Sequence, residues 1–141
     1  MYERTMTVVG LDDALVAGAE ILREAGKDPG RPVAVAVVDT AGDLVYFACM
    51  DGTGPDPRRY AIRKAYTAAK VACDTSVFAE RLQASGMDLG LLDDPQLITF
   101  TGGVCLRSEA GIVGGIGVSG HEGEEDERLA NVGRTALGMS E

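Results

Sequence analysis

Tryptophan is absent from this 141-residue chain, aromatic residues make up only 5% of it, and histidine occurs once. Proteins that bind single-stranded nucleic acid stack the bases on aromatic side chains, so this composition disfavours that class. The three cysteines, Cys49, Cys73 and Cys105, lie far apart and form no C-x-x-C motif. Their spacing argues against a disulfide framework and against a thiolate zinc site, and it is typical of a protein from a reducing compartment. No metal site is predicted.

Basic charge and long apolar runs are also scarce. The chain has 13 lysines and arginines against 22 acidic residues, and a net charge of −9 disfavours binding to a phosphate backbone. The longest purely apolar run spans residues 33–38, far short of the roughly 20 residues that cross a bilayer. The first ten residues lack the apolar segment of a secretion signal. We therefore expect a cytoplasmic protein that binds neither nucleic acid nor membrane.

The apolar residues that are present suffice for one core. Hydrophobic residues make up 45% of the chain, and no repeat or change of composition divides it, so residues 1–141 are predicted to form a single domain. Two segments have the pattern of β-hairpins, which implies a largely antiparallel sheet flanked by helices, an α+β fold. Apolar spacing and capping signals predict helices over 11–26, 58–73, 77–85 and from 123 onward, hairpins over 33–50 and 104–118, and a short strand over 97–100.

The spacing of apolar residues also predicts which side of two helices is buried. Residues that recur every three or four positions lie on one face of a helix. The predicted buried positions are Leu11, Leu15, Gly18, Leu22 and Ala25 in the first helix, and Leu129, Val132 and Ala136 in the last helix.

The glycines of "GIGVSG", residues 115–120, match the G-x-G-x-x-G pattern of dinucleotide-binding loops. That loop belongs to a βαβ unit, and no strand is predicted after the last helix. The helix after the motif also opens with several carboxylates, which would repel a pyrophosphate. We therefore expect these glycines to serve close packing or a strand bulge, or to expose bare backbone to a ligand.

Two side chains stand out as candidates for chemistry. His121 lies where the strand passes into the last helix, and an imidazole there can transfer a proton or ligate a metal or haem iron. Lys64 lies on an alanine-rich helix, from which it can hold an anionic group. A solvated surface position is the alternative for both residues.

Several motifs, in this order and spacing, resemble the GlcG/HbpS-like haem-binding family, which includes the C-terminal domain of PduO-type proteins. The resemblance covers roughly residues 8–137. The matching segments are "VAVVDTAGDLVYFACMDG", "RKAYTAAK", "ITFTGGVCL", "GIVGGIGVSG" and "EEDERLA". The family fold, profilin-like in outline, agrees with the α+β fold predicted from the residues.

The resemblance implies a homo-oligomer (dimer, tetramer or octamer) with a pocket for a small molecule, haem being the leading ligand. Haem-binding members can use a histidine in the first helix, and residues 11–26 contain none. At His121 a small residue is more usual in the family. The family pattern places ligand-binding or pocket-shaping residues at Met50, Asp51, Gly52, Lys64, Ala65, Thr67, Ala68, Gly102, Gly103, Gly117, Ser119, Gly120 and Asp126, and we add His121 to this set.

Three functions follow as hypotheses. The first is an oligomeric small-ligand-binding protein of this family. The second is an enzyme acting on a small organic acid or carbonyl compound, in which His121 transfers the proton, Lys64 holds the carboxylate or developing oxyanion, and Glu125 orients the imidazole. The third is an accessory subunit that serves assembly only.

Overall fold

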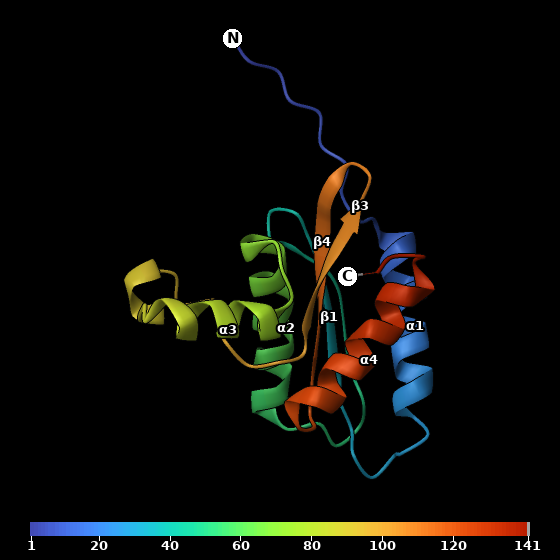
Figure 1. Cartoon of the computed structure of the whole chain (residues 1–141). Coiled ribbons are helices and arrows are strands. Elements are labelled where there is room, and N and C mark those ends of the chain that lie inside the picture. The colour runs from blue at the N-terminus through green and yellow to red at the C-terminus, as the bar shows by residue number, and fades with distance from the viewer. Residues whose placement is uncertain (141) are drawn as a thin grey trace.

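The computed structural model, which describes residues 1–140, consists of four α-helices, a 3-10 helix and a four-stranded antiparallel sheet (Figure 1). The elements are α1 (Leu11–Ala25), β1 (Ala34–Asp39), β2 (Leu44–Cys49), α2 (Pro55–Val71), α3 (Thr75–Ser85), the 3-10 helix η1 (Leu89–Leu92), β3 (Gly103–Ser108), β4 (Gly111–Ser119) and α4 (Gly123–Ala136). The predicted α+β fold with two hairpins is confirmed.

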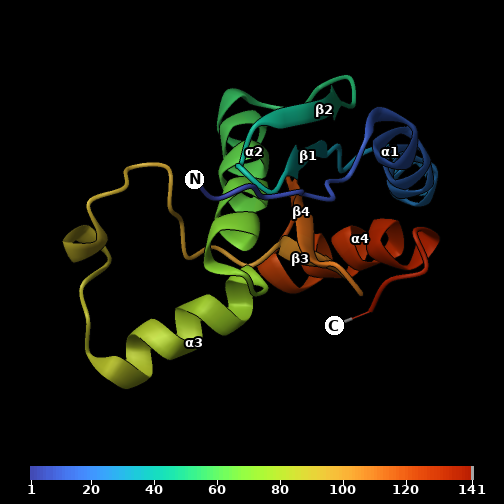
Figure 2. The same ribbon diagram turned by 90° about the horizontal axis from the view of Figure 1, so that it is seen from above.

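The strands lie in the order β2-β1-β4-β3, and helices cover both faces of the sheet. Helix α2 packs on one face, while α1 and α4 lie side by side on the other (Figures 1 and 2). Successive side chains of a strand point to opposite faces, so the residues of β1 contribute alternately to the cores on the two faces of the sheet. Val35 and Val37 join the cluster beneath α1 and α4, and Ala34 and Ala36 join the smaller cluster beneath α2.

Glycines on β4 explain why α2 lies so close to the sheet. A Cβ atom on Gly117 would overlap the carbonyl oxygen of Ala61, and one on Gly115 would overlap that of Ala65. The helix backbone therefore rests directly on the strand, which only glycine permits. The glycines of "GIGVSG" serve close packing, as one of the two sequence interpretations expected.

The predicted strand over residues 97–100 is wrong. This segment pairs with no strand, and the backbone N–H of Ile98 donates instead to the Thr67 hydroxyl of α2 at 3.0 Å. Leu97 and Ile98 are nevertheless buried. A short apolar run has the same pattern whether it is buried as a strand or as irregular chain. The pattern of residues 97–100 therefore could not distinguish these two structures.

The predicted buried faces of α1 and α4 were only partly right. In α1, Leu11 and Leu15 are exposed (Leu15 at 47%), and Ala14, Ala17 and Ile21 face the core. In α4, Leu129 is buried but Ala136 is exposed. Because α1 packs closely against β2 and α4, its inner face carries small side chains. The leucines of α1 therefore did not mark its buried face.

Helix α3 and the segment after it extend away from the rest of the molecule (Figure 2). The exposed apolar side chains Met87, Leu91 and Leu92 follow α3, and Leu91 is 76% exposed. Over residues 1–140, no helix has both the length and the apolar character that crossing a membrane requires.

Candidate functional site

A pocket of about 490 Å³ lies where the end of β4, the start of α4 and the first turns of α2 meet. Its volume falls within the range of about 300–1,000 Å³ that small-molecule sites occupy. The lining residues are Asp56, Pro57, Tyr60, Lys64, Phe100, Thr101, Ser119, Gly120, His121, Gly123 and Asp126.

A larger hollow of about 620 Å³ lies between the outward sides of α1 and α4. Every residue that lines it is exposed or half-buried, and its charged groups Glu20 and Arg128 pair with neighbouring side chains. It is an open groove without a buried polar group, so the smaller pocket is the better candidate for chemistry.

An ion pair between Lys64 and Asp126 lies at the floor of the pocket. The Lys64 Nζ lies 3.0 Å from Asp126 Oδ2 and also donates to the carbonyl oxygen of Val118 at 3.0 Å. The side chains of Lys64 and Asp126 are only 3% and 2% exposed. Burial lowers the pKa of Lys64 and raises the pKa of Asp126, while the opposite charge of each partner counteracts the shift.

Local sequence explains how a lysine is accommodated at this depth. Lys64 points from α2 across the sheet, and Gly102 supplies the space for its ammonium group. A Cβ on Gly102 would lie 2.8 Å from Lys64 Nζ, and the φ of +130° at Gly102 is one that L-residues with a side chain rarely adopt. Gly102 therefore shapes the site through its lack of a side chain.

Ser119 lies on the α2 side of the sheet, at the end of β4. It follows Gly115 and Gly117 at the strand period of two, beyond the point where α2 rests on the strand. The residue is 4% exposed and lines the pocket. No residue from 1 to 140 makes a hydrogen bond with its hydroxyl, so this group is available to a ligand in the pocket.

Two hydrogen bonds hold His121 in place, one through its backbone N–H and one through its ring. Its N–H donates to Asp126 Oδ1 at 2.9 Å, and its Nε2 lies 2.6 Å from the carbonyl oxygen of Arg31. Because a carbonyl oxygen only accepts, we assign the ring proton to Nε2, which leaves a lone pair on Nδ1. Among the side-chain atoms of residues 1–140, this Nδ1 is the one buried nitrogen or oxygen without a partner.

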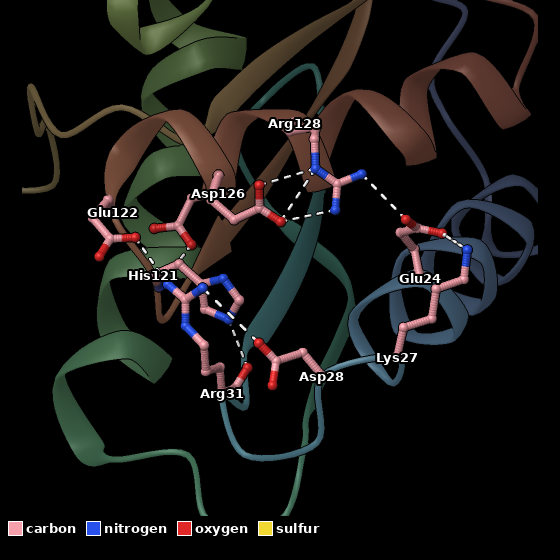
Figure 3. A network of polar contacts seen from close by, with 9 residues as sticks. Glu24, Lys27, Asp28, Arg31, His121, Glu122, Asp126 and Arg128 are labelled. Carbon is pink, nitrogen blue, oxygen red and sulfur yellow. Dashed lines mark hydrogen bonds and ion pairs between the residues drawn. The ribbon is translucent and has the colours of Figure 1, made fainter.

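Two carboxylates near His121 are paired with arginines, and Figure 3 shows one of them, Glu122, against Arg31. Glu122 accepts from Arg31 at 2.8 Å, and Glu125 accepts from Arg128, which holds the pKa of the Glu125 carboxyl below its usual value. The structure therefore does not bring Glu125 to the imidazole in the orienting role that the sequence suggested. The Arg31 carbonyl orients the ring, and Asp126 is the carboxylate that joins His121 to Lys64.

The other residues named from the sequence lie outside the lining of this pocket. Met50 packs against the core and its sulfur accepts from the Val33 N–H, while Asp51 is exposed. Thr67 is committed to Ile98. The remaining named positions, which line no part of the pocket surface, are Gly52, Ala65, Ala68, Gly102, Gly103 and Gly117. Of the predicted residues, the structure brings five together in the pocket lining: Lys64, Ser119, Gly120, His121 and Asp126.

Sequence reasoning missed the aromatic wall of the pocket. Tyr60 and Phe100 pack edge to face, with ring centroids 5.2 Å apart and an interplanar angle of 86°. Tyr60 precedes Lys64 by four residues on α2, which places both on one helix face, and this spacing was a usable signal. Phe100 carried no such signal, because it lies in irregular chain.

No group of three or more histidine, cysteine or carboxylate side chains is arranged to hold a metal ion in the part of the chain that the structure describes. The pocket thus offers an ammonium, a hydroxyl and two aromatic rings, and the His121 ring also lines it.

Residues 9–135 match the family model described as haem degrading protein HbpS-like. The chain belongs to the HbpS-like family. The match includes every residue of the pocket.

Individual relatives agree with this assignment. An uncharacterised 15.0 kDa protein in the dhaT-dhaS intergenic region of Citrobacter freundii is 31% identical over 101 residues, which cover 70% of this chain and 71% of that protein. The crystal structure of a double mutant of Streptomyces reticuli HbpS has a TM-score of 0.86 and 35% identity, and the match covers 96% of this chain and 90% of that one. A PduOC–haem complex has the same fold, with a TM-score of 0.82, 24% identity and coverage of 92% and 95%.

Proposed function

We propose that this HbpS-like chain binds a small ligand in the pocket at the start of α2, and that haem is the first ligand to test. The observation that carries the proposal is that one pocket is lined by the Lys64 ammonium, by Ser119, whose hydroxyl has no partner among residues 1–140, and by the ring pair of Tyr60 and Phe100. Two aromatic rings favour a flat apolar body, and two donors favour an acidic or carbonyl substituent on it.

The residues present fit the periphery of haem. Lys64 has three N–H donors and uses two of them, so one remains for a propionate oxygen together with the Ser119 hydroxyl. The flat macrocycle would lie against Tyr60 and Phe100. The family description and the haem complex of a protein with the same fold support haem as the ligand.

His121 does not fit as the ligand of a haem iron. Its Nε2, the nitrogen far from the side-chain attachment, is committed to the Arg31 carbonyl. Its Nδ1 is covered and lies next to the ring carbon that bears Cβ, where a porphyrin plane would collide with the side chain. Helix α1 has no histidine to take the role. We therefore propose that haem binds through its macrocycle and propionates, without ligation by His121.

A homo-oligomer and a cytoplasmic location remain proposals. Exposed Leu15 and Val16 beside the groove between α1 and α4 support self-association, because contiguous apolar surface marks interfaces. Light scattering coupled to size-exclusion chromatography would give the mass, and a monomer at micromolar concentration would reject the oligomer.

Titration of the protein and its variants with haemin tests whether haem binds and whether it binds in this pocket. We expect a shift of the Soret band, and affinity about threefold to tenfold weaker in Phe100→Ala, because an aromatic contact contributes about 0.5–1.5 kcal/mol beyond its buried area. Phe47→Ala is the matched control, since Phe47 is a similarly exposed phenylalanine on β2, outside the pocket. His121→Ala should leave the Soret position unchanged.

Two results would reject this proposal. Absence of any Soret shift at micromolar protein and haemin would exclude haem. A shift that Phe100→Ala and Phe47→Ala weaken equally would place haem outside the pocket.

The lone pair on His121 Nδ1 favours a second candidate, an enzyme for acid–base chemistry on a small organic acid or carbonyl compound. His121 would transfer the proton and Lys64 would hold the carboxylate or developing oxyanion, with Asp126 in place of Glu125 as the carboxylate that links them. Proton abstraction next to a carbonyl exchanges that hydrogen with solvent, so NMR in D2O with a panel of 2-oxo acids detects turnover. His121→Ala should abolish the exchange and Glu125→Gln should keep it.

Absence of exchange with every compound would reject the enzyme. Absence of any thermal shift with haemin or with the acids would leave the third candidate, an accessory subunit that serves assembly only.

A further inference from the structure

A second, smaller pocket of about 200 Å³ lies where α2 ends and α3 begins, beside β3. Residues of four segments line it: Ala72, Cys73, Asp74, Val77, Arg81, Cys105, Arg107, Arg134 and Ser140. None of these residues belongs to the pocket at the start of α2. Its volume is below that of sites for drug-sized molecules, so an occupant must be small.

A buried ion pair forms the inner wall of this pocket. Arg134 binds Asp74 through two parallel contacts, Nη1 to Oδ1 at 2.7 Å and Nη2 to Oδ2 at 3.0 Å. Asp74 Oδ1 also accepts from the backbone N–H of Cys105 at 2.9 Å. Both oxygens of Asp74 are engaged, and this carboxylate makes no capping bond to α3, although it occupies the N-cap position. The one acidic side chain of the pocket is therefore neutralised.

Two further arginines stand at the mouth of the pocket. Arg107 donates one N–H to the carbonyl oxygen of Ala72 at 3.1 Å and keeps its other donors. Arg81 makes no hydrogen bond or ion pair with any residue from 1 to 140. Both guanidinium groups lie close enough to Cys73 to act on its thiol electrostatically. The two arginines thus face the same small volume from α3 and from β3.

The thiols of the pocket add no negative charge at neutral pH. Burial raises the pKa of Cys73, against the opposing effect of the two arginines, and it raises the pKa of Cys105 to about 11. Three arginines then stand against a single aspartate in the lining, in a chain whose net charge is −9. Asp74 balances Arg134, so Arg81 and Arg107 are the guanidinium groups of the lining without an acidic partner among residues 1–140.

We propose that this pocket binds a small oxyanion, the phosphate or carboxylate group of a small molecule, between Arg81 and Arg107. A guanidinium group matches such anions with two parallel N–H donors, and two guanidinium groups that meet at one point give a clamp. The site is independent of the proposed ligand site around Lys64, because the two share no residue.

The test is binding of inorganic phosphate, with acetate as the carboxylate probe, measured by calorimetry on the full chain. We expect the double variant Arg81→Gln, Arg107→Gln to bind the preferred anion at least tenfold more weakly than the unaltered protein. Arg23→Gln is the matched control, because it removes an exposed arginine of α1 outside the pocket. Both pocket arginines are exposed, so the double variant should keep its fold and its circular dichroism spectrum.

Labelling of Cys73 with iodoacetamide gives a readout specific to the pocket. The bound anion should slow alkylation of Cys73, read by mass spectrometry, and leave that of Cys49 on β2 unchanged. Protection should vanish in the double variant and persist in Arg23→Gln. Stronger protection by phosphate than by acetate would identify a phosphate site, and the reverse a carboxylate site.

Three outcomes overturn the proposal. One is equal anion affinity in the unaltered protein and the double variant. Another is an equal loss in Arg23→Gln, which would reveal a general effect of charge. The last is absence of Cys73 protection at saturating concentrations of both anions.

Discussion

Replacement of Asp126 by asparagine tests the centre of the proposed site. The substitution keeps the size of the side chain and an oxygen that can accept from the His121 N–H, but it leaves the buried Lys64 ammonium without a counter-charge. Removal of one partner of a buried ion pair costs about 3–5 kcal/mol of unfolding free energy. A domain of this length has roughly 7–20 kcal/mol in total, so the loss should lower the melting temperature by about 10 °C or more.

The pH dependence of Asp126→Asn has a defined sign. The variant loses both effects of Asp126 that raise the pKa of Lys64, so burial lowers this pKa further than in the unaltered protein. Between the lowered folded pKa and the unfolded value of about 10.4, the unfolded chain binds more protons than the folded one. Stability of the variant should therefore rise with pH across that window, because Lys64 can lose its proton there.

Urea denaturation at pH 7 and pH 9, followed by circular dichroism, measures both effects. The deficit of Asp126→Asn against the unaltered protein should shrink at pH 9. The double variant Lys64→Met, Asp126→Leu should recover much of the loss, since apolar residues of similar volume can replace a buried pair. A deficit below about 1 kcal/mol that does not change with pH would refute the buried pair, because exposed ion pairs contribute about that little.

Further predictions concern the packing and the thiols. Gly117→Ala should cost about 1–3 kcal/mol of unfolding free energy, measured by urea denaturation, because the new Cβ meets the Ala61 carbonyl. Gly30→Ala should be nearly neutral, because a Cβ there would have only an ordinary contact with Asp28 Oδ1 at 3.9 Å. Equal losses would contradict the close packing of α2. Cys105, with its pKa raised to about 11 and little exposure, should resist a disulfide reagent at pH 8 until the protein is unfolded. Labelling of native Cys105 at the rate of Cys49 would contradict its burial.

Much of the fold could be predicted because its signals are local. The two hairpins follow from alternating β-rich runs on either side of a turn, and each helix follows from spacing within about four residues. The strand expected over 97–100 failed because burial of Leu97 and Ile98 depends on α2, which packs over them and supplies Thr67. The buried face of α1 failed for a related reason, since close helix packing favours Ala14 and Ala17 over the exposed Leu15.

The candidate site was partly predictable. The resemblance to the family selected Lys64, Ser119, Gly120 and Asp126, and the position of the single histidine suggested His121; all five line one pocket. It did not show that α2 packs directly on the glycines before Ser119, nor that the Arg31 carbonyl fixes the His121 ring. Such facts depend on backbone contacts between distant segments.

The sequence by itself determined the antiparallel sheet, the helices and the small residues of β4 that admit α2, because propensity and periodicity act between neighbouring residues. Only the tertiary structure decided which charges meet. Lys64 and Asp126 are 62 positions apart, and Asp74 and Arg134 are 60 apart. Such pairs form only where the packing of helices on the sheet brings two segments together and excludes water, and no local pattern in the sequence specifies that contact.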